Sequence, residues 1–348
     1  MQPLITRFNN FRKQKFLNNI LFKTSKQYAC VGVGMHSLAN LYPILNHFRI
    51  SIKYIYTRSS KWDGQMKQIF PTTRFTHSIE EIINDNDVEG VFICAAPSAH
   101  FEILKKLLQT GKKVFVEKPP CQHLSELNQL INIGPGLVCK IGLQRRYWPG
   151  NKHVSKRIAT AKTYQYAFHF GKYIQGDVYT ELFIHAFDYC SFLFGPYKIA
   201  SFSNHNDNDG ITVQLHVLHA NGVSGLIDLS TEFSWSAPFD QLVINCKSET
   251  ITLGYPLQVK SIQKPKHILG LPAERIMNQP LTTKEYFSAG NLLIPAAELN
   301  TLVLQGFYDE IKTFVNIVEG RISKNVTQND LPSMVNTFDI LDQLQHSK

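Results

Sequence analysis

The chain has 348 residues, more than a typical single hydrophobic core holds and enough for two domains. Hydrophobic residues make up 43% of it and charged residues 18%, as in ordinary globular proteins, and no apolar run approaches the roughly 18–20 residues that cross a bilayer. The net charge of +9 raises the question of nucleic-acid binding. No zinc-finger spacing, RNA-binding signature or basic heptad accompanies this charge. Composition therefore favours a protein whose partner is a small anionic molecule, with no nucleic acid and no membrane.

Residues 1–27 form a basic extension, and the first 62 residues contain no Asp or Glu. Such a leader can be an organelle presequence, but a helical extension on a cytoplasmic protein is the favoured interpretation. The six cysteines are scattered without metal-binding or redox spacing. We therefore expect no metal site, and nothing in the sequence requires an oxidising compartment.

Strand and helix patterns alternate from residue 28 to about residue 120. Apolar, β-branched runs predict strands, and amphipathic segments between them predict helices. Strands are expected near 28–33, 50–57, 88–96 and 113–117, with helices near 37–48, 78–87 and 97–110. This alternation predicts a parallel sheet of right-handed βαβ units. The sequence thus indicates a Rossmann dinucleotide-binding domain at 28–145.

The second half has a different character. Runs of alternating polarity at 160–172 and 196–262 predict a mostly antiparallel, open sheet with one covered face. Helical patches at 180–194, 300–319 and 330–345 would supply the cover. The segment 264–297, rich in Pro, Asn and Gly, is expected to be a long loop that borders the site. The fold class is therefore α/β, with a C-terminal α/β domain at 146–348 for substrate binding and oligomerisation, whose last helix can pack back on the Rossmann domain.

A glycine motif, GVGMHS, follows the first expected strand. Gly32 permits a tight strand-to-helix turn, and Gly34 lets the backbone approach a pyrophosphate at the helix N-terminus. Met35 and His36 belong to the same turn and are expected at the cofactor. Ser37 stands at the third fingerprint position, where Gly or Ala is usual. The motif is weak alone, but its place between a strand and a helix is what the fingerprint requires.

The end of the second expected strand bears on cofactor choice. Enzymes that use NAD(H) usually place an Asp or Glu there for the ribose 2′-hydroxyl. This chain has Thr57, Arg58 and Ser59, and its first acidic residue is Asp63. An arginine with neighbouring hydroxyls suits a 2′-phosphate, although Arg58 could also be a solvated loop residue. The sequence therefore favours NADP(H) over NAD(H).

The stretch from Val91 to Glu126 resembles the Gfo/Idh/MocA family, the relatives of glucose–fructose oxidoreductase and inositol dehydrogenase. The shared pattern is a strand, a Pro and a His, a helix, Gly-Lys, and a strand ending in Glu-Lys-Pro; the matching residues are Pro97, His100, Gly111, Lys112, Glu117, Lys118 and Pro119. The resemblance implies that Lys118 contacts the cofactor and binds the reacting oxygen. It also implies that Pro97, His100 and Glu117 lie at the cofactor.

A second match lies about 65 residues further on, where the family tends to carry Asp, His and Asp on a substrate-domain helix. This chain has Glu181, His185 and Asp188. His185 is the natural acid or base at neutral pH, because an imidazole titrates near pH 6.5. Glu181, one methylene longer than the usual Asp, would orient His185 or pair with Lys118. Phe183 replaces a small residue and should reshape the pocket.

Other residues are weaker candidates for the substrate side. Arg145 and Arg146 could contact an anionic substrate or the cofactor, with Tyr147 and Trp148 lining the cleft, or the arginines could form a surface pair between domains. Tyr286, in the expected loop, is a further candidate.

The resemblance implies an NAD(P)-dependent oxidoreductase that transfers hydride to or from a carbonyl or hydroxyl of a sugar, nucleotide sugar or polyol. It also implies a homo-oligomer, a dimer or tetramer formed through the C-terminal sheet. Two alternatives stay open. One is an enzyme of the same fold whose retained cofactor performs transient redox chemistry in a lyase or glycosidase cycle. The other is a non-catalytic nucleotide sensor.

Overall fold

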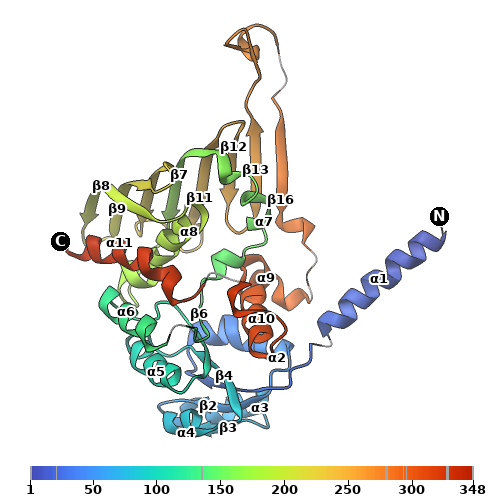
Figure 1. Cartoon of the computed structure of the whole chain (residues 1–348), viewed down its shortest axis with the longest axis vertical. Helices are drawn as coiled ribbons and strands as arrows, with labels where there is room; N and C mark the ends of the chain where they lie inside the picture. The colour runs from blue at the N-terminus through green and yellow to red at the C-terminus, as the bar shows by residue number, and fades with distance from the viewer. Residues whose placement is uncertain are drawn as a thin grey trace. The chain divides into compact units, whose positions relative to one another are not determined.

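The computed structural model describes residues 2–346 except 21, 135, 279–280, 293, 295 and 327–328. It divides into two compact units. The first unit contains Met1–Gln144 and Leu293–Val335, and the second contains Arg145–Leu292 and Asn336–Lys348. Each unit has its own sheet, labelled in Figure 1.

The first unit contains a six-stranded parallel sheet in the order β3-β2-β1-β4-β5-β6. This is the strand order of a Rossmann domain, so the predicted fold is confirmed. The strands are β1 (Gln27–Val31), β2 (Ile52–Tyr56), β3 (Arg74–Thr76), β4 (Val88–Ile93), β5 (Lys113–Val116) and β6 (Cys139–Ile141). The segments between them are η1 (Ser37–Leu41), α2 (Tyr42–His47), η2 (Ser60–Trp62), α3 (Asp63–Ile69), α4 (Ile79–Asn84), α5 (Pro97–Gln109) and α6 (Leu124–Ile133).

Burial explains why the central strands read as continuous apolar runs. Residues 28–31 of β1 and 91–93 of β4 are all fully buried, as expected of a parallel sheet covered on both faces. Helix α5 begins at Pro97, where the missing N–H of proline costs no hydrogen bond. Each crossover therefore follows from local sequence signals.

The segment 293–335 belongs to the first unit, whereas the sequence placed it in the second domain. It contains α9 (Asn300–Gln305) and α10 (Phe307–Val318), followed by the short helical turns η9 (Lys324–Val326) and η10 (Leu331–Met334). Phe314 of α10 packs its ring 5.1 Å from that of Phe92 and 5.8 Å from that of Phe115. Segment 293–335 joins the first unit because the apolar face of α10 covers strands of the parallel sheet. These strands lie far away in the sequence, so the sequence does not show the contact.

Glu319, just after α10, ties the chain before β1 to this segment. Its carboxylate accepts hydrogen bonds from the Ser25 N–H and hydroxyl, both at 2.8 Å, and from the Tyr28 hydroxyl at 2.9 Å. The Lys26 N–H donates a further bond at 3.2 Å. Burial alone would raise the pKa of Glu319, but these hydrogen bonds outweigh it and hold the pKa below its usual value near 4.5.

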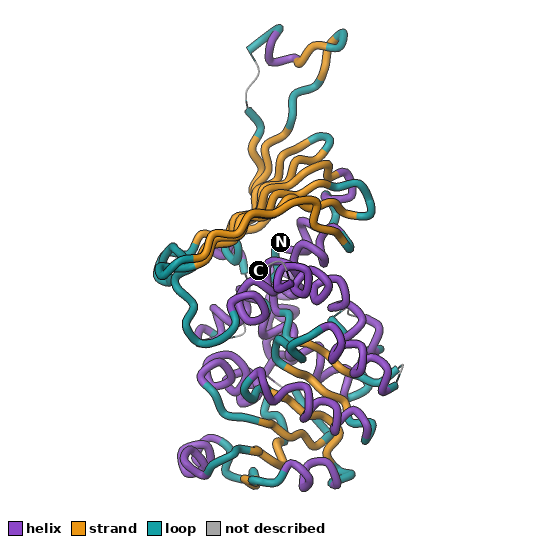
Figure 2. Tube along the Cα trace, turned by 90° about the vertical axis from the view of Figure 1, so that its left-hand side faces the viewer, coloured by secondary structure: helices purple, strands orange, loops and turns teal. Residues whose placement is uncertain are grey.

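The second unit contains an eight-stranded sheet in the order β16-β13-β12-β11-β7-β10-β9-β8, seen nearly edge-on in Figure 2. All neighbours are antiparallel except β7 and β10, which run parallel. The predicted large, mostly antiparallel sheet is confirmed. Its strands are β7 (Ala161–His169), β8 (Tyr197–Asn206), β9 (Ile211–His219), β10 (Ser224–Ser230), β11 (Phe239–Cys246), β12 (Glu249–Gly254), β13 (Gln258–Gln263) and β16 (Thr283–Ser288).

One face of this sheet packs against helix α8 (Ile184–Phe194). The ring of Tyr164 on β7 stacks on that of Phe194 at a centroid distance of 4.4 Å, and Tyr166 lies against Tyr189 at 6.3 Å. On the opposite face, Leu218 and Leu226 are about half exposed. The alternation of buried and exposed residues along the strands thus arises from cover on a single face.

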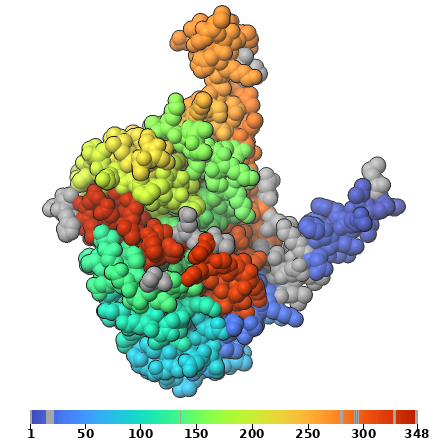
Figure 3. Space-filling model, in the orientation of Figure 1, coloured from blue at the N-terminus to red at the C-terminus, as the bar shows by residue number. Residues whose placement is uncertain are grey.

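The segment 264–297, expected to be a long loop or excursion, is an excursion that also contains regular strands. The segment contains a small hairpin of β14 (His267–Ile268) and β15 (Leu271–Pro272), and it returns as β16, which pairs with β13. The hairpin stands out as the orange lobe of Figure 3. Phe287 is buried while Tyr286 and Ser288 on either side of it are partly exposed, which fits an edge strand packed on one face. Flanking Pro, Asn and Gly residues obscured this signal.

The basic extension contains α1 (Gln2–Ile20), a helix without acidic residues. Leu4, Ile5, Phe8 and Phe11 are all more than half exposed. None of the described helices is long and apolar enough to span a bilayer.

We expect Glu319→Gln to lower the free energy of unfolding at pH 7 by about 1–3 kcal/mol, because charge-assisted hydrogen bonds to Ser25 and Tyr28 are lost. The folded-state pKa is depressed, so this contribution is present above pH 4.5 and disappears as pH falls through the folded-state pKa. Urea denaturation at pH 7 and at pH 3.5 measures it. Glu102→Gln, at an exposed position of α5, is the control. A difference that persists undiminished at pH 3.5 would contradict the assignment.

Candidate functional site

The glycine turn of the first unit has the geometry that its motif predicts. Gly32 has a φ of +103°, and an added Cβ would lie 2.7 Å from the carbonyl oxygen of Cys94 and 2.8 Å from backbone atoms of Ala95. Both the backbone angle and the close approach of two strands therefore require glycine. No heavy atom lies within 4 Å of a Cβ added to Gly34. The side of Gly34 on which a Cβ would lie is therefore unobstructed.

Ser37 closes the turn in place of the usual third glycine. Its buried hydroxyl accepts a hydrogen bond from the Gly34 N–H and donates one to the Gly34 carbonyl, both at 2.9 Å. A π-helical turn, η1, begins at Ser37. Such turns are rare and often occur at functional sites. The sequence identified Ser37 as a departure but did not show what the departure does.

Side chains that follow β1 and β5 meet at the carboxyl edge of the sheet. His36 Nδ1 lies 3.7 Å from Glu117 Oε1, and the Glu117 side chain is only 12% exposed. Met35 is 83% exposed beside them. Ligands of open α/β sheets bind at this edge. The structure thus brings together Gly32, Gly34, His36 and Glu117 as predicted cofactor residues of one unit.

The segment after β2 is ordered by its own hydrogen bonds. The Thr57 hydroxyl lies 2.9 Å from the Ser59 carbonyl and 3.3 Å from Asp63 Oδ1, and His77 Nδ1 lies 2.8 Å from the Thr57 carbonyl. Arg58 and Ser59 are exposed. Asp63 is thus engaged by Thr57, while the Arg58 side chain is presented to solvent.

His100 is buried and bridges two backbone segments. Its Nδ1 lies 2.8 Å from the Pro119 carbonyl and its Nε2 lies 2.9 Å from the Ala95 carbonyl. These bonds connect α5 to the end of β4 and to the segment after β5, which carries the half-buried Lys118. His100 therefore positions the strand end that bears Lys118. Pro97 is the first residue of α5.

In the second unit, Glu181 lies in a second π-helical turn, η5 (Tyr179–Phe183), and His185 follows at the start of α8. Both side chains are half-buried. The wider turn changes the angle between positions 181 and 185 from that of a regular α-helix. Residue spacing gave no sign of this π-turn.

Tyr173 holds the Glu181 carboxylate. Its hydroxyl donates a hydrogen bond of 2.9 Å to Glu181 Oε2. Burial is the largest cause that raises the pKa of Tyr173, followed by this hydrogen bond and the charge of Glu181. The phenol therefore stays protonated and able to donate. No sequence pattern pointed to Tyr173, because it lies eight positions before Glu181 in an irregular segment.

The arginines expected on the substrate side form buried ion pairs. Arg145 lies 2.6 Å from Asp240 Oδ2, and its guanidinium carbon lies 4.0 Å from the centre of the Tyr255 ring. Arg146 pairs through two nitrogens with Asp188, one at 3.0 Å, and these side chains are 6% and 3% exposed. Both guanidinium groups are thus engaged by carboxylates, which favours a structural role.

The aromatic candidates lie in the packed interior of the second unit. Phe183 is fully buried against Tyr179 and Phe168, at centroid distances of 5.8 and 6.5 Å. Tyr147 is half-buried. Tyr286 donates to Glu249 at 3.2 Å and lies under the guanidinium of Arg157. The expectation that Trp148 lines a cleft is wrong, since it is 1% exposed and its indole N–H bonds to the Pro256 carbonyl.

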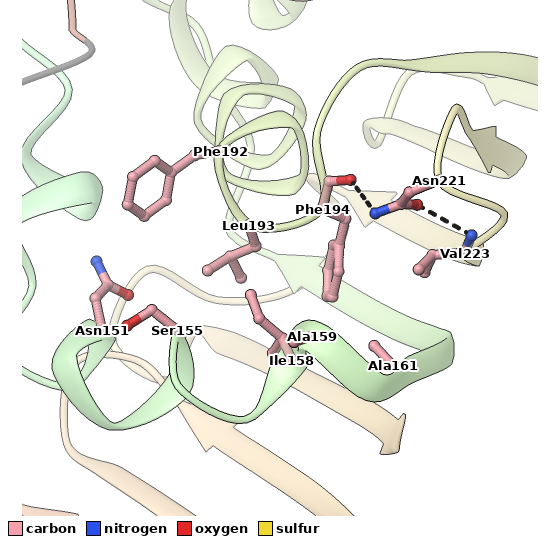
Figure 4. Close-up of a pocket in the computed structure, with 10 residues that line it drawn as sticks. All are labelled: Asn151, Ser155, Ile158, Ala159, Ala161, Phe192, Leu193, Phe194, Asn221 and Val223. Carbon is pink, nitrogen blue, oxygen red and sulfur yellow. Dashed lines mark hydrogen bonds between the residues drawn. The ribbon is translucent and has the colours of Figure 1, made fainter. Parts of the chain in front are cut away.

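A cavity of about 400 Å³ lies beside the end of α8 (Figure 4). Its polar side chains already serve the fold: the Asn221 amide donates to the Phe194 carbonyl, and the Asn151 amide donates to the carbonyls of Arg145 and Arg146. A polar substrate would find few free partners there. The cavity is lined by Asn151, Ser155, Ile158, Ala159, Ala161, Phe192, Leu193, Phe194, Asn221 and Val223.

The glycine turn, its open backbone and the carboxyl-edge pair of His36 and Glu117 define a dinucleotide-binding domain. Residues 26–136 match the model of an oxidoreductase family with an NAD-binding Rossmann fold, Gfo/Idh/MocA. The match lies within the nucleotide-binding unit of this chain, which is similar to that family.

Curated relatives match over short stretches. The uncharacterized oxidoreductase YhhX of Escherichia coli is 35% identical over 79 residues, which cover 23% of each chain. The NAD⁺-dependent scyllo-inositol 2-dehydrogenase of Bacillus subtilis is 26% identical over 139 residues, covering 36% of this chain and 40% of its own. The NADP⁺-dependent scyllo-inositol 2-dehydrogenase IolW of the same organism is 33% identical over 79 residues, covering 23% of this chain and 21% of its own.

Solved structures extend the likeness of fold to both units. A dehydrogenase from Chromobacterium violaceum superposes with a TM-score of 0.79 at 16% identity, over 94% of this chain and 96% of its own. The 3-ketoreductase KijD10 of Actinomadura kijaniata, solved with NADP and TDP-benzene, superposes with a TM-score of 0.70 at 12% identity, over 93% and 98%. The chain thus has the complete fold of these dehydrogenases.

Proposed function

We propose that this protein is an NADP(H)-dependent oxidoreductase that transfers hydride to or from a carbonyl or hydroxyl carbon of a sugar, nucleotide sugar or polyol. The observation that supports this proposal most directly is the tight turn at Gly32, followed by Gly34 with its Cβ side unobstructed. This turn lies at the sheet edge where Glu117 precedes Lys118. Two of the relatives are named as dehydrogenases of scyllo-inositol, a cyclic polyol. These names support the substrate class proposed for this chain.

The proposed chemistry assigns a separate role to each of three side chains. The nicotinamide supplies or accepts hydride when bound. Lys118 Nζ binds the reacting oxygen and stabilises its developing negative charge. His185 gives a proton to that oxygen during reduction and takes it during oxidation. Glu181, whose carboxylate accepts the Tyr173 hydrogen bond, orients His185.

The proposed preference for NADP(H) rests on Arg58. Its side chain is exposed at the end of β2, beside the hydroxyls of Thr57 and Ser59. Asp63, the nearest acidic residue in the sequence, shares a hydrogen bond with Thr57. A guanidinium with adjacent hydroxyls suits a dianionic 2′-phosphate better than a neutral 2′-hydroxyl. The named relatives include enzymes of both cofactors, so Arg58 carries this part of the proposal.

A homo-oligomer through the C-terminal sheet is also part of the proposal. The face opposite α8 exposes Leu218 and Leu226, and a broad hollow of about 610 Å³ lies on it. Apolar side chains on an open sheet face are a common feature of subunit interfaces.

Lys118→Ala should reduce turnover by two or more orders of magnitude, because one charge that stabilises the developing alkoxide is lost. NADPH affinity should stay within severalfold of wild type. Steady-state kinetics with a sugar or polyol and fluorescence titration of NADPH measure the two quantities. Lys105→Ala, on the exposed side of α5, is the matched control. Unchanged turnover would remove Lys118 from the mechanism.

Arg58→Ala should weaken NADPH binding by tenfold or more and leave NADH binding within about twofold, since only NADPH carries the 2′-phosphate. Titration of each reduced cofactor by fluorescence gives both constants. Lys61→Ala, three residues further on, tests whether any loss of positive charge has the same effect. An equal loss for both cofactors would contradict the 2′-phosphate assignment.

Light scattering should show a dimer or tetramer at micromolar protein concentration. Leu226→Glu, at the centre of the open sheet face, should shift this mass towards the monomer because it places a charge in an apolar contact. Leu4→Glu, on α1, should leave the mass unchanged. A wild-type monomer would overturn this part of the proposal.

A further inference from the structure

A group of aromatic side chains adjoins Glu181 and has no task in the proposed chemistry. Trp235, in the segment between β10 and β11, is 50% exposed. Its ring centroid lies 5.5 Å from that of Phe170 and 6.4 Å from that of Tyr173. Tyr173 in turn donates its hydroxyl hydrogen bond to Glu181. Two contacts thus lead from an exposed indole to a predicted catalytic carboxylate.

The indole is fixed in place although half of it faces solvent. Its N–H donates a 3.0 Å hydrogen bond to the Lys172 carbonyl. A Cβ added to Gly171 would lie 2.4 Å from Trp235 Cδ1. Position 171 must therefore be glycine for the indole to lie against the backbone there. A tryptophan held by a hydrogen bond and by close backbone contact needs little further ordering when a ligand binds to it.

The same short segment makes room for the carboxylate at its other end. A Cβ added to Gly176 would lie 2.1 Å from Glu181 Oε1. Residues 171–176 thus run between Trp235 and Glu181, with a glycine at each contact. Tyr173 lies between these glycines and touches both side chains. The Trp235 ring and the Glu181 carboxylate both pack against the backbone of residues 171–176. This shared contact defines the spacing between them.

This combination matches one class of small molecule. A six-membered polyol ring has apolar C–H groups on its faces and hydroxyls around its edge. The C–H groups pack on the electron-rich face of an indole, and an edge hydroxyl donates to a carboxylate. A linear polyol has no flat apolar face to offer. Phe233, two positions before Trp235, is 54% exposed, and Ile174, next to Tyr173, is 79% exposed.

We propose that Trp235 and Tyr173 form an aromatic wall beside Glu181 that binds a cyclic polyhydroxylated substrate, a cyclitol or a pyranose, by stacking against its ring face. This inference deepens the proposed function and rests on it in assigning Glu181 to the substrate site. Trp235 acts as a specificity residue for ring-shaped substrates. It takes no part in the proton transfers.

The test compares ring and chain substrates on the same protein. Calorimetric titration of the NADP⁺-saturated protein with scyllo-inositol, glucose and sorbitol gives binding constants that do not depend on turnover. Trp235→Ala should weaken scyllo-inositol and glucose by about tenfold or more, a loss of about 1.4 kcal/mol, and sorbitol by less than twofold. Trp235→Phe should restore most of the ring affinity. Trp62→Ala, a similarly exposed tryptophan of the first unit, should change nothing.

The outcomes separate the wall from the proposed function. The aromatic wall is overturned if Trp235→Ala weakens binding of ring and chain ligands equally, or weakens neither. It is also overturned if the wild-type protein binds neither scyllo-inositol nor glucose. Turnover of any sugar or polyol by that same wild-type protein would leave the proposed function standing. Ring binding that depends on Trp235 without any turnover would support the wall and overturn the proposed chemistry. Trp235→Phe reports on the wall even if the alanine variant fails to fold.

Discussion

At Gly32 the first strand leaves the parallel sheet so close to the end of β4 that a single methyl group would collide with the Cys94 carbonyl oxygen, 2.7 Å away. The following helix therefore starts at the carboxyl edge of the sheet, and the open Gly34 backbone lies beside it. His36 then faces Glu117, which follows β5. The approach of two strands at one glycine thus places the glycine turn at the edge of the sheet where Glu117 follows β5.

In the second unit, buried ion pairs fix the frame that carries Glu181 and His185. Arg146 pairs with Asp188 of α8, and Arg145 pairs with Asp240 of β11. Removing one member of such a pair leaves an uncompensated buried charge at a cost of about 3–5 kcal/mol. These contacts hold helix and sheet in one arrangement, with both guanidinium groups engaged by carboxylates.

The surroundings of Glu181 suggest how this chain tolerates a carboxylate longer than the family's usual Asp. The π-turn at Tyr179–Phe183 changes the direction of the side chain, and the Tyr173 hydroxyl holds its Oε2. Phe183, where a small residue is usual, is buried against Phe168 and Tyr179. Substitutions that looked independent in the sequence therefore lie in one packed region, with Tyr173 joining it to the exposed indole of Trp235.

The sequence by itself determined the Rossmann fold class, the glycine turn and the large antiparallel sheet, because these follow from local patterns: apolar runs, period-two alternation and a short motif between a strand and a helix. Only the tertiary structure decided that residues 293–335 complete the first unit, that Arg145 and Arg146 are engaged by Asp240 and Asp188, and that β16 is a strand. Tyr173 and Trp235 also emerged only there. Each of these depends on contacts between residues distant in the chain or on backbone irregularities such as the π-turn, and neither leaves a periodic signal in the sequence.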